Sequence, residues 1–280
     1  MTTRLLCLGL GVGLAGPVLA KVPVAAKAVS AKTSAQALIN IDVPQTRADL
    51  FGTDADRATV AAARLGQTRQ AGALDALLDA LSMGSSPRVA ASALESVALH
   101  KSAASLDVLL HYAHHRNADV RSKAVLALGG LEDKRAIAAW HEAFSDGDKQ
   151  VRAAAARIAA ARKDASSIDA LVTLLQKGDD AAPSALSVVG SADVARRVAE
   201  LIGEAPDRLV AECLGQILVR PDLGKEEVYV EIVRAIGKIP GDEAVVALTT
   251  FISSTPEKPP RQSRREAQVL YEQRLGGENQ

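Results

Sequence analysis

A pattern of 31 residues is written twice in succession within residues 117–178, and this repeat constrains the fold more than any other feature of the sequence. Val120 and Arg121 in the first copy recur as Val151 and Arg152 in the second. Each copy predicts two amphipathic helices joined by a turn. Because neither helix can bury its apolar stripe alone, successive copies must stack to form a continuous core.

The same register extends beyond these two copies, since Val89 lies 31 residues before Val120. After Gly178 the pattern persists with looser spacing. We expect helices at residues 54–66, 71–81, 88–100, 103–115, 118–129, 134–144, 149 to about 162, 166–177, 180–190, 193–202, 207–218, 225–238, 241–252 and 262–275. The sequence therefore predicts an all-α fold, an α-solenoid of about five to seven stacked helix pairs.

A glycine recurs where the first helix of several pairs is expected to end. These glycines are Gly66, Gly129, Gly190, Gly215 and Gly237. Glycine adopts the left-handed conformation without steric cost, and it often ends helices in that conformation. We therefore expect left-handed helix ends at these positions.

The ends of the chain differ from the repeats. Arg4, an apolar run over residues 5–16 and Val18-Leu19-Ala20 have the order of a cleavable signal peptide. The expected organisation is a signal peptide at 1–20, a flexible leader at 21–45, the repeat array at 46–253, and a Pro/Arg-rich break with a C-terminal capping helix at 254–280. This organisation predicts an exported protein, periplasmic or secreted, with no integral membrane span after cleavage.

Composition excludes several functions. The formal net charge is zero and only 2% of residues are aromatic, so the chain lacks the basic face and stacking platform expected for nucleic-acid binding. Phosphate-loop, dinucleotide, nucleophile-elbow and Cys-x-x-Cys motifs are absent from the sequence. Cys213 lies in an apolar helical setting, which predicts a buried thiol. We expect no cofactor and no catalytic residues.

Asp119-Val120-Arg121 with Ala124 and Leu128-Gly129 resembles the first helix of short HEAT repeats of the bilin lyase-like (PBS lyase-type) kind. The resemblance covers about residues 54–252 and is strongest in the middle. It implies a scaffold of stacked helix pairs. From the residues themselves, Asp119 is expected to accept hydrogen bonds from the start of its helix. Arg121 and Arg152 are expected to reach acidic or carbonyl groups of neighbouring repeats. Together with Val120, Val151 and Gly129, these residues are interpreted as structural repeat positions.

One cluster of histidine and acidic side chains, near residue 111, is a candidate for a more specific function. With Leu106, Leu109, Leu110 and Ala113 facing the core, the opposite flank of the helix carries Asp107, His111, His114 and His115. Asp107 and His111, and His111 and His115, are i, i+4 pairs, from which two side chains can reach one metal ion. A solvated polar face and a partner-binding surface remain alternatives to this weak metal candidate.

Two further residues lie near this region. Trp140 and His141 align with Leu109 and Leu110 at the 31-residue offset. Trp140 is therefore expected in the core, and His141 at its border as a half-buried histidine.

The second helices supply the predicted binding face. The repeat offset aligns polar residues in two rows, Asp107, Ala138 and Asp169, and His111, Glu142 and Thr173. We expect the second helices to line a concave surface that binds a protein or peptide. The predicted function is that of an exported, non-enzymatic scaffold. The alternatives are a bilin lyase-like enzyme or enzyme accessory, and a metal-handling envelope protein that uses the His111 region.

Overall fold

The structure is a computed structural model that describes residues 39–277. The predicted signal peptide and residues 21–38 of the predicted leader lie outside this range. Within it the chain forms fifteen α-helices and no strands, apart from one isolated bridge between Ile202 and Ala205. The all-α prediction is confirmed. The helices are α1 (Val43–Leu50), α2 (Ala55–Gly66), α3 (Ala73–Ser82), α4 (Pro87–His100), α5 (Leu106–Ala113), α6 (Ala118–Leu128), α7 (Lys134–Glu142), α8 (Lys149–Arg162), α9 (Ile168–Gln176), α10 (Ala182–Val189), α11 (Ala192–Ala199), α12 (Asp207–Leu218), α13 (Glu226–Lys238), α14 (Glu243–Ser254) and α15 (Gln262–Gly277).

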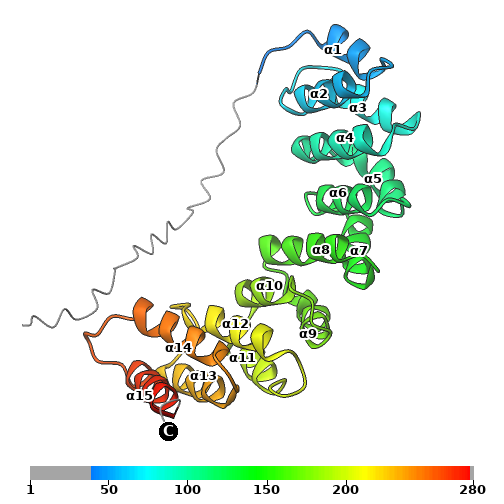
Figure 1. The fold of residues 1–280 in the computed structure, drawn as a ribbon. Coiled ribbons are helices and arrows are strands. Elements are labelled where there is room, and N and C mark those ends of the chain that lie inside the picture. The colour runs from blue at the N-terminus through cyan, green and yellow to red at the C-terminus, as the bar shows by residue number, and fades with distance from the viewer. Residues whose placement is uncertain (1–38, 278–280) are drawn as a thin grey trace, which may run out of the picture. The chain divides into compact units, whose positions relative to one another are not determined.

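The helices form two layers. Each even-numbered helix from α2 to α12 packs on the next even-numbered helix, and the odd-numbered helices from α3 onward form the second layer (Figure 1). The described residues therefore contain seven helix pairs, from α2/α3 to α14/α15, within the five to seven predicted. This arrangement is an α-solenoid. We call α2, α4, α6, α8, α10, α12 and α14 the first helices, and their odd-numbered partners the second helices.

Helix α1 begins inside the segment that was predicted to be a flexible leader. Asp42 caps it by accepting a hydrogen bond from the Gln45 N–H at 2.9 Å, and the helix packs on α2. Just before it, the Ile41 N–H donates to Gln70 Oε1 at 2.8 Å. The ordered array thus starts a few residues before position 46.

The core between the layers repeats with the sequence. Val120 and Val151, one repeat apart, are both fully buried, and so are Ala124 and Ala155. Fully burying a valine side chain stabilises a fold by about 1.5–3 kcal/mol. Trp140 is buried, as expected, and its ring lies edge-on to Phe144. Alanine fills many of the remaining core positions, which lets neighbouring helices approach closely.

The recurring glycines do not have the predicted left-handed conformation. Positive φ angles occur at other glycines of the described chain: Gly72, Gly84, Gly178, Gly203, Gly224 and Gly241. Instead, a Cβ atom added at Gly129 would lie 2.5 Å from Ile158 Cγ1, and one at Gly66 would lie 2.7 Å from Ser96 Cβ. Both contacts join a first helix to the next first helix. The prediction was wrong, and at Gly66 and Gly129 the glycine provides room for helix packing instead of a left-handed backbone conformation.

Side chains of the following repeat lie against the carbonyl groups at several helix ends. Arg162 donates to Gly129 O at 3.0 Å, and Arg274 donates to Gly237 O at 2.9 Å. His100 Nε2 lies 3.1 Å from Leu65 O. The last carbonyl groups of a helix lack intrahelical partners, and positive charge is favourable there. A side chain from the next repeat thus does what a left-handed glycine does in other helices.

The two layers are not equally tight. From α2 to α12, neighbouring first helices pack along much more of their length than neighbouring second helices do. Where one layer of a helical stack is spaced more closely than the other, the stack bends toward the closer layer. In this part of the chain the concave face is therefore the one formed by the first helices, because glycine and alanine bring these helices together. The sequence analysis expected the second helices to form it.

The pairing near the C-terminus also differs from the sequence prediction. Residues 225–238 were read as a first helix, but α13 lies in the second layer and packs on α11 and α15. Helix α15, expected to be a separate cap, packs against both α13 and α14 and buries Ser263 and Ala267. It is the second helix of the last pair. Because the repeats are irregularly spaced after Gly178, the sequence pattern did not show that residues 225–238 form a second helix.

Candidate functional site

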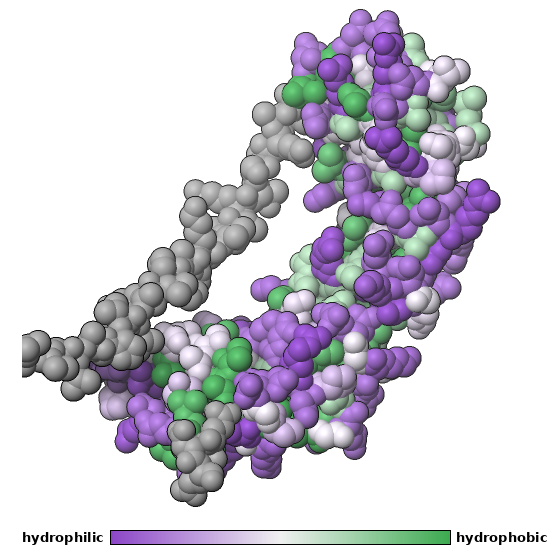
Figure 2. Space-filling view, in the orientation of Figure 1, coloured by the Kyte–Doolittle hydropathy of each residue, from purple (hydrophilic) through white to green (hydrophobic). Residues whose placement is uncertain are grey.

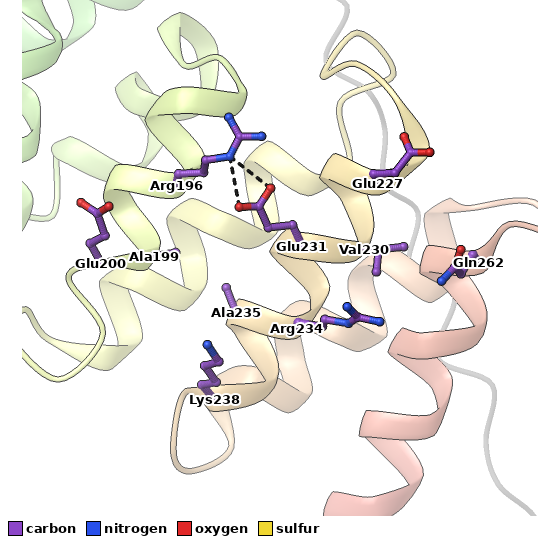
Figure 3. Close-up of a pocket in the computed structure, with 10 residues that line it drawn as sticks. All are labelled: Arg196, Ala199, Glu200, Glu227, Val230, Glu231, Arg234, Ala235, Lys238 and Gln262. Carbon is purple, nitrogen blue, oxygen red and sulfur yellow. Dashed lines mark hydrogen bonds and ion pairs between the residues drawn. The ribbon is translucent and has the colours of Figure 1, made fainter.

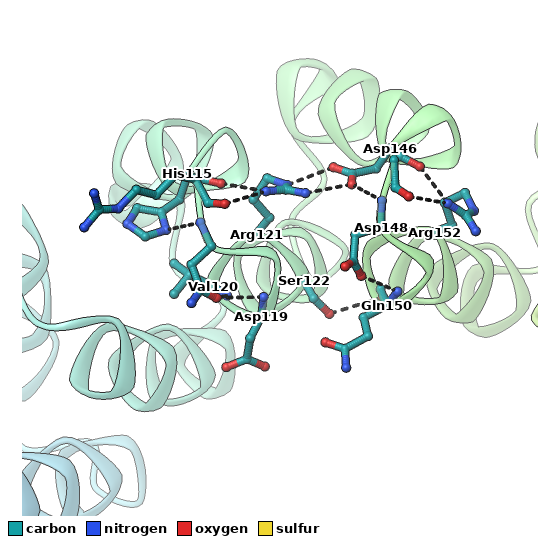
Figure 4. Close-up of polar contacts among 12 residues, drawn as sticks. His115, Asp119, Val120, Arg121, Ser122, Asp146, Asp148, Gln150 and Arg152 are labelled. Atoms are coloured by element: carbon teal, nitrogen blue, oxygen red, sulfur yellow. Dashed lines mark hydrogen bonds and ion pairs between the residues drawn. The ribbon is translucent and has the colours of Figure 1, made fainter.

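Arg121 links two successive repeats (Figure 4). Its Nε and Nη2 atoms donate to the two carboxylate oxygens of Asp146 at 2.9 and 2.8 Å, and its Nη1 donates to His115 O at 2.9 Å. The side chains of Arg121 and Asp146 are only 19% and 16% exposed. The hydrogen bond from Arg121 lowers the pKa of the Asp146 carboxyl group, and the same bond raises the pKa of Arg121. Such a bidentate pair fixes a turn and leaves little for a ligand.

Arg152 repeats this arrangement one unit later. Its Nε donates to Asp179 Oδ2 at 2.6 Å, and its Nη1 donates to Asp146 O at 2.9 Å. Asp119 does not cap α6, however, because Asn117 Oδ1 accepts from the N–H groups of residues 119 and 120 at 3.0 and 3.3 Å (Figure 4). Asp119 lies in the first turn with its side chain exposed. The cap position belongs to the residue before the helix, and that residue is Asn117.

The histidine cluster near the end of α5 is more dispersed than the sequence suggested. His111 and His114 are exposed, and His115 Nδ1 accepts the Asn117 N–H at 3.1 Å. The ring of Tyr112 lies between the rings of His111 and His115, edge-on to the first and stacked on the second. Among residues 39–277, no group of three or more His, Cys, Asp or Glu side chains could hold a metal ion.

Tyr112 itself was missed by the sequence reasoning. It is buried, and its hydroxyl group donates to Leu81 O at 2.7 Å. Leu110, which was expected to face the core, is only half-buried. His141 is half-buried as expected, and its Nε2 lies 3.1 Å from Asp164 Oδ2.

The residues of the two polar rows are exposed, and some are bound to neighbouring second helices. Asp107 pairs with Arg135 at 3.0 Å, and Asp169 pairs with Arg197 at 2.8 Å. Thr173 Oγ1 donates to the carbonyl oxygen of Asp169 at 2.9 Å, within its own helix. Glu142 and Ala138 are exposed. Ion pairs thus connect consecutive second helices at 28-residue intervals.

A groove of about 700 Å³ lies on the second helices nearer the C-terminus (Figure 3). It is lined by α11, α13 and the start of α15. Its lining residues are Arg196, Ala199, Glu200, Glu227, Val230, Glu231, Arg234, Ala235, Lys238 and Gln262. Arg196 Nε lies 3.1 Å from both carboxylate oxygens of Glu231, which joins α11 to α13. The groove is open, and its lining carries both signs of charge.

Three charged side chains of this groove are not used by the fold. Glu200, Glu227 and Lys238 make no hydrogen bond or ion pair through their side chains within residues 39–277, and all three are exposed. The sequence reasoning missed them because it followed the rows only as far as Thr173. The series of acidic and basic residues that form ion pairs along the second helices, such as Asp107 with Arg135, was the sequence signal that pointed to this region.

The described residues contain one cysteine, Cys213. Cys213 is fully buried, and its burial raises the pKa of the thiol, so the reactive thiolate is suppressed. No helix within residues 39–277 has the length and apolar character needed to cross a membrane.

The fold defines the chain as an α-helical repeat protein. Residues 106–187 match the family model of HEAT repeats, which confirms the expected resemblance over that segment. No curated protein matches the chain significantly.

Solved structures with a similar fold include enzymes and a binding protein. The complex of CpcE and CpcF of phycocyanin lyase from Nostoc sp. PCC7120 has a TM-score of 0.46 and 17% identity, covering 84% of this chain and 95% of that one. Human deoxyhypusine hydroxylase in complex with glycerol has a TM-score of 0.38 and 17% identity, covering 82% and 96%. A designed armadillo repeat protein in complex with the peptide (KR)4 has a TM-score of 0.36 and 16% identity, covering 82% and 100%. At these values the likeness does not distinguish an enzyme from a binding protein.

Proposed function

We propose that this chain is an exported, non-enzymatic scaffold that binds a protein or peptide along its second helices. The observation that carries the proposal is the groove of α11, α13 and α15, where Glu200, Glu227 and Lys238 are exposed and unused by the fold. Charged groups at the surface that have no internal partner can pair with a ligand without first losing a native contact.

The size of the groove favours a polypeptide. About 700 Å³ in an open channel accommodates several side chains of an extended or helical segment. Both signs of charge are present along its walls, which would fix the register and direction of a bound chain. The polar rows at Asp107, His111, Glu142, Asp169 and Thr173 lie on earlier second helices and would extend the contact surface toward the N-terminus.

The test compares partner capture by the wild-type protein and by a variant that carries Glu200→Ala, Glu227→Ala and Lys238→Ala. Both proteins are immobilised and exposed to the envelope fraction of the source cells after chemical crosslinking, and captured proteins are quantified by mass spectrometry. The variant should capture the specific partner at least about ten-fold less, because interfacial charged contacts commonly contribute this much to affinity. Equal capture by both proteins would exclude the groove as the binding site.

A matched control changes the same number of charges on the first helices. Asp119→Ala, Asp242→Ala and Arg157→Ala replace two acidic residues and one basic residue at exposed positions. Capture by this control should equal that of the wild type. Both triple variants should keep their helicity and melting temperature, since exposed substitutions usually change stability by only about 0.5 kcal/mol or less.

A second variant tests the earlier rows and the metal alternative together. His111→Ala, Glu142→Ala and Thr173→Ala should weaken capture if the contact extends along α5, α7 and α9. Added zinc or copper should leave the melting temperature of the wild type unchanged, because a specific metal site would raise it. A rise that depends on His111 would support metal handling in place of a polypeptide contact.

Export is part of the same proposal and has its own measurement. The order of Arg4, the apolar run at 5–16 and Val18-Leu19-Ala20 supports cleavage before Lys21 and a periplasmic or secreted location. N-terminal sequencing of the protein recovered from its native compartment should give Lys21 as the first residue. A chain that still begins at Met1 would contradict export by this route.

A further inference from the structure

A second groove lies on the opposite layer, between the first helices α12 and α14. It has a volume of about 400 Å³, and its floor is made of apolar and small residues. Val246 is 65% exposed and Val219 is 40% exposed. Figure 2 shows apolar residues gathered on the part of the surface where Figure 1 places α14. Exposed apolar surface with a polar rim is typical of an interaction site.

The sequence forms this groove through small residues at helical spacing. Ala211, Gly215 and Val219 follow one another at i, i+4 and i+8 along α12, and α14 contributes Ala247 beside them. A Cβ atom added at Gly215 would lie 3.1 Å from Ala247 Cβ, so the two helices are nearly in backbone contact at this point. The resulting channel has low walls and runs along the helices for about 12 Å, at a rise of about 1.5 Å per residue.

The rim of this groove is acidic. Glu212 and Glu243 border it, with Arg208 as the basic residue of the lining. Arg208 forms ion pairs with both Asp180 and Glu212, the second at 3.5 Å. Glu243 borders the same groove and has no ion-pair partner within residues 39–277. One arginine therefore faces three carboxylate groups, those of Asp180, Glu212 and Glu243, which leaves excess negative charge beside the apolar floor.

We infer that this groove binds the apolar face of a basic amphipathic helix supplied by another protein. Two adjacent helices with residues at i, i+4 spacing present parallel ridges, and the side-chain ridge of a third helix fits between such ridges. Lysine or arginine residues that flank its apolar stripe would lie over Glu212 and Glu243. This site lies on the first helices, so it does not depend on the proposed function of the second-helix groove.

A second copy of this chain fits the groove less well. A symmetric dimer through this face would bring α12 and α14 of each copy together, and each copy carries the same acidic rim. Like charges at a contact oppose association. The charge of the rim thus selects a basic partner over self-association.

The experiment measures binding of a synthetic probe to the full-length mature protein by fluorescence anisotropy. The probe is an 18-residue labelled peptide with leucine and alanine on one helical face and lysine on the other. An otherwise identical peptide with glutamate in place of lysine is the charge control. The lysine peptide should bind, the glutamate peptide should bind at least about ten-fold more weakly, and added salt should weaken the lysine peptide's binding.

Protein variants locate the site. Glu212→Lys with Glu243→Lys should reduce affinity for the lysine peptide by about ten-fold or more, and Val246→Ser should reduce it without a change in charge. The matched control, Asp75→Lys with Glu204→Lys, makes the same charge change at exposed positions that line neither groove and should bind like the wild type. Melting temperatures within a few degrees of the wild type would show that the variants fold.

Three results would overturn the inference. These are no binding of the lysine peptide, equal binding of the lysine and glutamate peptides, and equal losses in the two double variants. The last result would mean that the peptide responds to the total charge of the protein and not to this groove. None of these outcomes affects the proposed second-helix site, whose test uses other residues and another readout.

Discussion

Replacing Gly129 with alanine tests how tightly the first helices are packed. The added Cβ atom would lie 2.5, 2.8 and 2.9 Å from Cγ1, Cδ1 and Cγ2 of Ile158 on the next first helix. Real Cβ atoms essentially never approach this closely, so the isoleucine or the helix must move. Ile158 is buried and β-branched, so its rotamer is restricted and cannot adjust easily.

The expected change in the free energy of unfolding on replacing Gly129 with alanine is the balance of two opposing effects. Overpacking a core with one extra methyl group costs about 1–3 kcal/mol. Alanine at a helix end reduces the freedom of the unfolded chain and offsets up to about 1 kcal/mol of this cost. We therefore expect Gly129→Ala to lower the free energy of unfolding by about 1–2 kcal/mol. For a domain of this size that corresponds to a fall in melting temperature of about 2–8 °C.

The assay is urea denaturation followed by circular dichroism, with two further variants. Gly147→Ala is the control, because a Cβ atom there would meet nothing within 4 Å, and its stability should stay within about 0.5 kcal/mol of the wild type. Ile158→Ala removes the clashing atoms, so Gly129→Ala should be neutral or stabilising in that background. If Gly129→Ala is as stable as the wild type, or if it is equally destabilising in the Ile158→Ala background, the packing role assigned to this glycine is refuted.

Two other predictions concern the central repeats. Val120→Asp places an unpaired charge at a fully buried position and should lower the unfolding free energy by about 3 kcal/mol or more, measured by thermal unfolding; an unchanged transition would contradict the burial of this residue. The lowered pKa of Asp146 means that its ion pair with Arg121 contributes stability above the unfolded-state pKa of about 4, and that this contribution is lost as the pH falls through the lower folded-state pKa. Asp146→Asn should therefore be clearly less stable than the wild type at pH 6, with a difference that shrinks from about pH 5 downward in urea denaturation.

The amphipathic period placed the helices from α2 onward, although it did not indicate α1. Residues 207–218 were expected to be helical, and α12 has those bounds. Local signals suffice here because one helix face must be apolar in any stack of this kind. The repeat also identified Val120 and Val151 as buried positions, since equivalent residues in successive units occupy equivalent environments.

Features that depend on neighbouring repeats were predicted less well. The sequence does not distinguish a glycine that gives a helix end its conformation from one that makes room for Ile158, because both stand at the end of a helix. Tyr112 was not assigned to the core from the sequence, and it is buried because the carbonyl group of Leu81 satisfies its hydroxyl. In both cases the deciding atom comes from a residue about 30 positions away, beyond the reach of a local pattern.

The candidate site was missed for a related reason. Glu200, Glu227 and Lys238 lie after the point where the spacing of the repeats becomes irregular, so the 31-residue offset no longer identifies equivalent positions. The layer of α13 could not be assigned without the contacts that it makes to α11 and α15. Three helices that are unevenly spaced along the sequence form this surface, so it can be recognised only once their packing is known.

The two layers hold together by different interactions, and this difference bears on where a partner can bind. First helices meet through glycine and alanine, as at Gly129 and Gly215, so their spacing is fixed by atoms that cannot move apart without opening a cavity. Second helices meet partly through exposed ion pairs such as Arg196 with Glu231. An exposed ion pair contributes only about 0–1 kcal/mol. In the proposed function, a partner would therefore replace such a pair with a contact of its own at little cost, and binding along the second helices would leave the packing that holds the first helices together undisturbed.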